Sequence, residues 1–387
     1  MCDEPPSSPG GGVFDFPSYR LGKIFGIPIE VNASWVIIFA LVSLSLGAGY
    51  YPSIPEASGA PRLLFAALGV LTAFLFFSSI VVHELAHALV TRASGGRVEK
   101  ITLFIFGGVA ELADEPTSPG KEFLMAAAGP AMSMVIAALA LTGYLAAIST
   151  GASWWLSAPL QYLATINFFV GAFNLLPGFP LDGGRVLRAI LWGVTGDILK
   201  ATRWAARCGQ TIGWALVAYA VLGVLGILPG ASDTVWLGLV GWFIVWLAGS
   251  AYQQQVVRSR LEAITVGSIM TPHPHTVSGE VTVEQLAHDH FLGGQHSRYP
   301  VLFEGSVHGL ISLADIKAVD RPDWPFVRVI DVTNRDLAAL AVPIDAPVGS
   351  LISRFSGEKP GALLVVGDGR LVGIVTRADV ISAIQHP

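Results

Sequence analysis

Residues 63–90, LLFAALGVLTAFLFFSSIVVHELAHALV, decide the fold of this protein. The segment is almost entirely apolar and is long enough to cross a bilayer, which takes about 20 such residues in a helix. Other stretches share this character, so we expect a polytopic α-helical membrane protein. Its expected transmembrane helices number about six, at roughly Val31–Tyr51, Leu63–Val90, Phe123–Ile148, Trp155–Leu176, Ile212–Leu228 and Val235–Tyr252.

The amino-acid composition divides the chain into parts. Hydrophobic residues make up 52% of the 387 residues and charged residues 13%, against about 25% charged in an average soluble protein. Charges are sparse from Val31 to Tyr252 and frequent after Arg258. The net charge of −5 is too small to indicate a nucleic-acid partner. We therefore expect an N-terminal cytoplasmic tail over residues 1–30, a transmembrane domain over 31–255 and a soluble domain over 264–387.

The loops between the expected helices differ in charge between the two sides of the membrane, and Lys and Arg gather in cytoplasmic loops. One side has only Arg62, whereas the other has Arg20, Lys23, Arg92, Arg97, Lys100, Lys121, Arg185, Arg188, Lys200, Arg203, Arg207, Arg258 and Arg260. This asymmetry predicts a multi-pass protein of the cell membrane with both termini in the cytoplasm. Residues 1–30 lack the basic start and apolar core of a cleavable signal, so the first helix is expected to be an uncleaved anchor.

His83, Glu84 and His87 form the pattern H-E-x-x-H near the end of the segment quoted above. Residues four apart lie on one face of a helix, so both imidazoles can bind one metal ion. Glu84 lies beside them and can take a proton from a metal-bound water. An ionisable group inside a membrane helix costs roughly 2.5 to 3.5 kcal/mol on insertion scales. Three such residues in one turn therefore indicate a metal site; the alternative is a polar helix end at the membrane interface.

A catalytic zinc site usually has three protein ligands and one open position. Most other acidic residues of the transmembrane domain fall in expected loops, but Asp182 ends the stretch NLLPGFPLD, residues 174–182. The prolines and glycine of this stretch break the preceding helix and allow the carboxylate to turn inward. The alternative is that Asp182 caps the following helix, Gly184–Leu191. Because a two-histidine site needs a third ligand, we favour the ligand.

A shorter apolar stretch lies between the second and third expected helices. Ile101–Val109 is rich in β-branched residues, contains the pair Gly107-Gly108, and is too short to span a bilayer. We expect a strand or hairpin that dips into the membrane, which requires its backbone to be buried in protein or to line a cavity. The alternative is a loop that connects two helices.

The pairing of H-E-x-x-H with N-x-x-P-x-x-x-L-D-G in a later helix resembles the site-2 protease family of intramembrane metalloproteases. The resemblance covers residues 31 to about 207 and implies one Zn²⁺ per chain and regulated intramembrane proteolysis of a membrane-spanning protein substrate in the lipid bilayer. It implies zinc ligands at His83, His87 and Asp182, and a catalytic role for Glu84. It further implies contacts with the substrate, or for Asn174 with the developing oxyanion, at Gly107, Gly108, Asn174 and Pro177.

The soluble domain contains an internal repeat, with GLISLAD at Gly309–Asp315 and GIVTRAD at Gly373–Asp379. Each motif follows an apolar strand, which predicts a duplicated α/β unit over 264–320 and 329–386. The repeat resembles tandem CBS domains, and that resemblance implies an adenine nucleotide and a possible homodimer. It would place Asp315 and Asp379 at ribose hydroxyls, and Ser312 and Thr376 near phosphate. The alternative is that these residues only cap helices.

Other function classes remain open at this point. A transporter or channel gated by the CBS pair would suit six spans, but it predicts acidic residues spread over several helices. The acidic residues that we expect to be buried instead concentrate at Glu84 and Asp182. A non-catalytic zinc-binding scaffold would not need Glu84. The sequence therefore favours an intramembrane metalloprotease.

Overall fold

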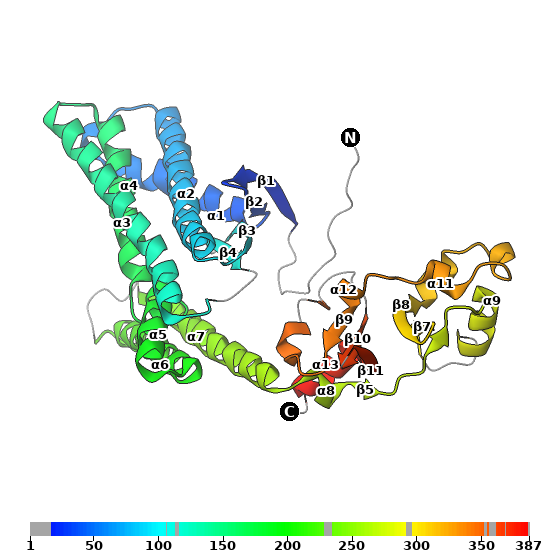
Figure 1. The fold of residues 1–387 in the computed structure, drawn as a ribbon. Helices are drawn as coiled ribbons and strands as arrows, with labels where there is room; N and C mark the ends of the chain where they lie inside the picture. The colour runs from blue at the N-terminus through cyan, green and yellow to red at the C-terminus, as the bar shows by residue number, and fades with distance from the viewer. Residues whose placement is uncertain are drawn as a thin grey trace. The chain divides into compact units, whose positions relative to one another are not determined.

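The computed structural model describes residues 17–105, 107–112, 116–227, 234–291, 296–351, 354–355, 361–367 and 369–385. The chain divides into two compact units, Met1–Gln253 and Gln254–Pro387. Figure 1 shows that long helices dominate the first unit, whereas the second combines short helices with sheets.

Apolar helices build the first unit: α1 (Trp35–Ser45), α2 (Arg62–Ala93), α3 (Pro119–Ser149), α4 (Trp154–Asn174), α5 (Asp182–Thr195), α6 (Ile198–Val224) and α7 (Thr234–Ala263), which continues into the second unit. Five stretches of the described residues are long and apolar enough to cross a membrane, at Trp35–Ser53, Arg62–Ala93, Pro119–Ser149, Trp154–Asn174 and Val235–Ala263. In each of these stretches, at most 39% of the most apolar 18-residue segment is buried inside the protein. Their apolar side chains therefore face mainly outward, as expected of helices that contact lipid.

The remaining expected span, Ile212–Leu228, lies mainly on α6, and Leu228 is outside the described residues. The first turns of α6 carry Lys200, Arg203 and Arg207. Its uncharged apolar part, Ile212–Val224, is only about 20 Å long at 1.5 Å per residue, which is less than the roughly 30 Å core of a bilayer. The number of spans therefore stays a prediction.

A four-stranded sheet packs against the second half of α2. Its order is β1 (Ser18–Ile24), β2 (Ile27–Asn32), β3 (Val98–Phe104) and β4 (Gly107–Leu112), with β2 and β3 parallel and the other pairs antiparallel. Ile27, Ile29 and Ile101 are buried against Leu85 and Ala88 of α2. The sheet is therefore fixed to the helix that carries H-E-x-x-H.

Two hairpins make up this sheet. The sequence predicts a tail up to residue 30 and a helix from Val31, but residues 18–32 form the β1–β2 hairpin and α1 begins at Trp35. The physical reason is a period-two pattern, since Ile27, Ile29 and Val31 are buried on one face of β2. The β3–β4 hairpin matches the strand or hairpin expected around Ile101–Val109. That it enters the membrane stays a prediction.

The second unit contains the two copies expected from the repeat. In the first copy β7 (Arg298–Phe303) and β8 (Ser306–Ser312) lead into α10 (Leu313–Lys317), and in the second β10 (Ala362–Gly367) and β11 (Arg370–Thr376) lead into α13 (Arg377–Gln385). The strand orders are β6-β7-β8 and β5-β11-β10-β9, where the remaining strands are β5 (Thr271–Pro272), β6 (Val277–Ser278) and β9 (Ala341–Pro343). Two separate apolar cores form, one around β7 and β8 and one around β10 and β11; the start of the first copy, with Val266, belongs to the core of the second.

Candidate metal centre

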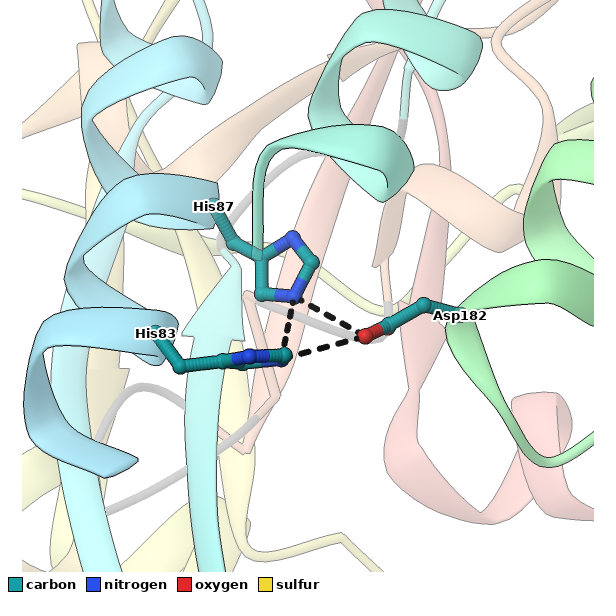
Figure 2. A group of neighbouring side chains, drawn as sticks. All are labelled: His83, His87 and Asp182. Carbon is teal, nitrogen blue, oxygen red and sulfur yellow. Dashed lines mark hydrogen bonds and ion pairs between the residues drawn. The ribbon is translucent and has the colours of Figure 1, made fainter. Parts of the chain in front are cut away.

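Three side chains from α2 and α5 meet at one point inside the first unit. Nε2 of His83 lies 3.2 Å from Nε2 of His87, and Oδ2 of Asp182 lies 3.2 Å from each of them. Figure 2 shows the two imidazoles on successive turns of α2, facing the carboxylate at the start of α5. Both histidines are buried. Among the residues that the structure describes, these three side chains form the one group of His, Cys, Asp or Glu donors that lie close enough together to hold a metal ion.

The spacing of these donor atoms fits a zinc ion. Zinc binds imidazole nitrogen and carboxylate oxygen at about 2.0 to 2.2 Å in tetrahedral geometry. Ligands at those distances on a tetrahedron lie about 3.3 Å apart. The three donor atoms already form a triangle with sides of 3.2 Å. Two imidazoles and one carboxylate can therefore bind one zinc ion and leave a fourth position open.

The other ring nitrogen of each histidine is held by α3. Nδ1 of His87 lies 2.7 Å from the carbonyl oxygen of Met125, and Nδ1 of His83 lies 2.8 Å from Oγ of Ser133. A carbonyl oxygen only accepts hydrogen bonds, so Nδ1 of His87 carries the proton and Nε2 presents its lone pair to the site. Such outer contacts orient the ligands and raise their basicity. Neither partner was expected from the sequence, because neither has a signature in the spacing of residues.

Gly129 lets α3 approach the two histidines. A Cβ atom at this position would overlap Nε2 of His83 and Nε2 of His87. Any residue with a side chain would therefore displace the two imidazoles or push α3 away from α2. The absence of a side chain at Gly129 is thus a steric condition for the site.

Asp182 is the first residue of α5, and Leu181 rather than Asp182 is its N-cap. Asp182 therefore does not cap this helix, and its carboxylate contacts the two histidines instead. A buried ion pair between Arg188 of α5 and Glu122 of α3 ties the two helices together. The guanidinium of Arg188 also lies 5.3 Å from the ring of Phe179, in the loop before Asp182. These contacts position the carboxylate.

Glu84 lies against the strand β4. A Cβ atom at Gly108 would come within 2.7 Å of Cγ of Glu84, so the strand passes this side chain at close range. β4 is also the last strand of the sheet, with β3 on one side only. Among the described strands the other edge of β4 is unpaired, so its backbone groups can pair with an added strand. Gly107 starts β4 with φ of 130°, a conformation that favours glycine.

The structure does not bring Asn174 or Pro177 to the metal centre by any hydrogen bond among the described residues. Nδ2 of Asn174 donates to the carbonyl oxygen of Val170 in its own helix, at 3.0 Å. Pro177 is exposed. Roles for these two residues stay predictions.

The residues expected to bind a nucleotide form helix caps in the second unit. Oδ2 of Asp315 accepts from the backbone N–H and the hydroxyl of Ser312, at 2.7 and 2.6 Å. Oδ2 of Asp379 accepts in the same way from Thr376, at 2.8 Å each. The capping alternative thus accounts for both pairs, and nucleotide binding stays a prediction.

A cleft of about 580 Å³ lies between the two copies. Its lining includes Thr376. It also includes four residues that the sequence did not indicate as ligand contacts, His275, His296, Arg298 and Arg377.

Comparison with known proteins gives matches along the whole chain. Residues 71–150 and 143–220 match peptidase family M50, and residues 266–321 and 329–386 match the CBS domain. The Synechocystis protein sll0528 and Rip3 of Mycobacterium tuberculosis, both named as zinc metalloproteases, are each 36% identical to this chain. The first match covers 97% of both chains, and the second covers 94% of this chain and 92% of Rip3. The solved site-2 protease from Methanocaldococcus jannaschii is 31% identical over 61% of this chain and 95% of that one, with a TM-score of 0.42.

Proposed function

The chain belongs to peptidase family M50, the site-2 proteases, and is a metalloprotease with tandem CBS domains; from this membership we propose that it hydrolyses peptide bonds of membrane-spanning proteins inside the bilayer. We assign the zinc ligands to His83, His87 and Asp182 and the general base to Glu84. One observation carries the proposal: donor atoms from two separate helices form a triangle with the spacing of zinc ligands, and one of these helices is long and apolar enough to cross a membrane.

The chemistry divides between the metal and the protein. When bound, zinc would lower the pKa of a coordinated water and polarise the scissile carbonyl. Glu84 accepts a proton from the attacking water and later donates it to the leaving amine. The Met125 carbonyl keeps His87 in the tautomer whose Nε2 can act as a ligand.

The substrate segment must be extended, because a helix engages the carbonyl groups that the reaction attacks. We propose that it pairs with the free edge of β4, at Gly107 and Gly108, by strand addition. The position of Gly108 supports the assignment, because a Cβ atom there would come within 2.7 Å of Cγ of Glu84, so β4 runs close to the proposed base. We also propose Pro177 as a substrate contact and Asn174 as a contact to the oxyanion, for which the Asn174 amide would have to release the Val170 carbonyl.

The finer parts of the proposal concern topology and regulation. The distribution of Lys and Arg supports a cytoplasmic location for both termini and for the CBS domains. We propose that the CBS pair binds an adenine nucleotide and associates into a homodimer, and that the nucleotide changes access to the metal centre. Such control requires a ligand with different affinity for the open and closed states.

The proposed base is tested by cleavage of a transmembrane peptide in lipid vesicles, with the native chain, Glu84→Gln and a matched control, Glu99→Gln. Loss of a general base typically costs 10²- to 10⁴-fold in rate, whereas Glu99 is an exposed residue of β3. We expect the control to cleave at the native rate and Glu84→Gln to lose at least about 100-fold with zinc still bound. Equal rates for all three would remove Glu84 from the mechanism.

The third ligand is tested separately by zinc content. We expect Asp182→Ala to retain much less zinc than the native chain at equal free zinc. Native zinc affinity in this variant would remove the assignment of Asp182.

A further inference from the structure

A groove of about 530 Å³ lies on the first unit between the β1–β2 hairpin and α2. Its volume is in the range of small-molecule binding sites. Its walls are mainly apolar and come from both hairpin strands, α1 and α2, with Leu21, Ile24, Ile29, Trp35, Phe74 and Phe77 among them. The one charged side chain in its lining is Lys23.

The groove is separate from the metal centre. Successive residues of an α-helix are rotated by about 100°, since a turn takes 3.6 residues. The α2 residues that line the groove include Phe74, Ser78 and Val81, and they point to the side of α2 roughly opposite to His83 and His87. An occupant of this groove therefore does not lie at the zinc ligands.

The two ends of the groove differ in polarity. The carbonyl oxygen of Phe25, at the tip of the hairpin, accepts a hydrogen bond from the guanidinium of Arg92 at 2.5 Å. Lys23, two residues from the tip, therefore lies at the same end of α2 as Arg92. On α2 the lining runs from Val82 back to Phe74, a stretch of about 12 Å at 1.5 Å per residue. The groove thus leads from its one cationic residue, Lys23, into an apolar region.

The surroundings of the groove are those of a lipid-facing surface. Phe74 on its wall is 58% exposed, and neighbouring residues of α2 such as Leu71 are exposed as well. On the hairpin, Leu21 and Ile24 are exposed too. One wall of the groove therefore belongs to α2, a helix that is long and apolar enough to cross a membrane.

The side chains of the lining offer few hydrogen-bond partners, so a peptide lying against them would leave backbone N–H and C=O groups unpaired, at several kcal/mol each in an apolar site. Ser78 is the one hydroxyl side chain in the lining, and it donates to the carbonyl oxygen of Phe74. An acyl chain brings no such groups. A headgroup phosphate is complementary to Lys23, for which no ion pair is found in the described part of the chain.

We propose that this groove binds one phospholipid with an anionic headgroup, with the phosphate at Lys23 and one acyl chain along Phe74, Phe77 and Val81. The lipid fills the space between the hairpin and α2. Because β2 pairs with β3, and β3 with β4, the same lipid also supports the sheet whose last strand lies beside Glu84. The proposal does not depend on the proteolytic function.

Native mass spectrometry of the full chain, purified in detergent, tests the site. The probes are phosphatidylglycerol and phosphatidylcholine with identical acyl chains, and glycerol phosphate without acyl chains. The variants are Lys23→Glu, Ser78→Trp, which fills the groove, and Leu21→Glu, which puts a charge on its exposed wall without changing α2. The matched controls are Lys200→Glu and Ser149→Trp, at exposed positions outside the groove.

We expect the native chain and both controls to retain one phosphatidylglycerol in preference to phosphatidylcholine. Lys23→Glu should lose roughly fivefold or more of this preference, the size expected for one basic residue near an anionic lipid. Ser78→Trp and Leu21→Glu should lose the bound lipid. Native retention in Leu21→Glu, an unchanged preference in Lys23→Glu, or displacement of the lipid by glycerol phosphate alone would each overturn the proposal.

Discussion

Replacement of Gly129 by alanine tests whether the close approach of α3 makes the metal centre possible. The new Cβ atom would overlap Nε2 of both His83 and His87, the proposed zinc ligands. To restore an ordinary contact of about 3.5 Å, the histidines or α3 must move by about 1 Å. Such a displacement in a catalytic site can cost about 100-fold in rate. Disturbed outer contacts alone typically cost 10- to 100-fold in metal affinity. We therefore expect zinc affinity and cleavage rate each to fall by about 100-fold or more.

The same substitution at Gly143, also in α3, is the matched control. A Cβ atom there would make only ordinary contacts with Leu160, at 3.6 Å. Alanine is favoured over glycine inside a helix by roughly 1 kcal/mol, so neither variant should lose helical structure. The assays are zinc retention against a graded chelator, cleavage of a transmembrane peptide, and circular dichroism to show that both variants are folded. If Gly129→Ala binds zinc and cleaves like Gly143→Ala, the steric argument is wrong.

Three further predictions follow from other contacts. Ser133→Ala removes the partner of Nδ1 of His83, and we expect zinc affinity to fall by about 10- to 100-fold; an unchanged dissociation constant in a zinc competition assay would contradict this. Arg188→Met removes the cation that pairs with the carboxylate of Glu122, which is only 1% exposed. We expect the free energy of unfolding to fall by roughly 3–5 kcal/mol and to be partly restored in the double variant with Glu122→Gln. Equal chemical denaturation of the native chain and the single variant would refute this. Thr376→Ala removes the hydroxyl that accepts from the backbone N–H of Asp379 at the start of α13, a cap worth about 0.5–2 kcal/mol. Amide hydrogens of α13 should therefore exchange faster, and unchanged exchange would show that the cap does not stabilise this helix.

Much of the first unit follows from local sequence. The two histidines four residues apart share one helix face whatever the rest of the fold does, and an apolar run of this length predicts a membrane helix. The repeat in the second unit is likewise visible because both copies keep the same strand and helix pattern. These features depend on periodicity along one segment, which a sequence displays directly.

Features that depend on contacts between distant segments could not be predicted in the same way. The sequence suggested Asp182 as a ligand by elimination, but only the packing of α5 on α3 places its carboxylate 3.2 Å from both imidazoles. The Met125 carbonyl is a backbone group, so no residue type marks it. The β1–β2 hairpin was missed because its alternating pattern is short and directly precedes an apolar helix.

The sequence by itself thus determined the helix that carries H-E-x-x-H and the duplicated second unit, because both follow from the spacing of residues along one segment. The tertiary structure alone decided which atoms complete the metal centre. Donor distances near 3 Å depend on how closely α2, α3 and α5 pack, and this closeness is set by side chains that are absent, as at Gly129, as much as by those present.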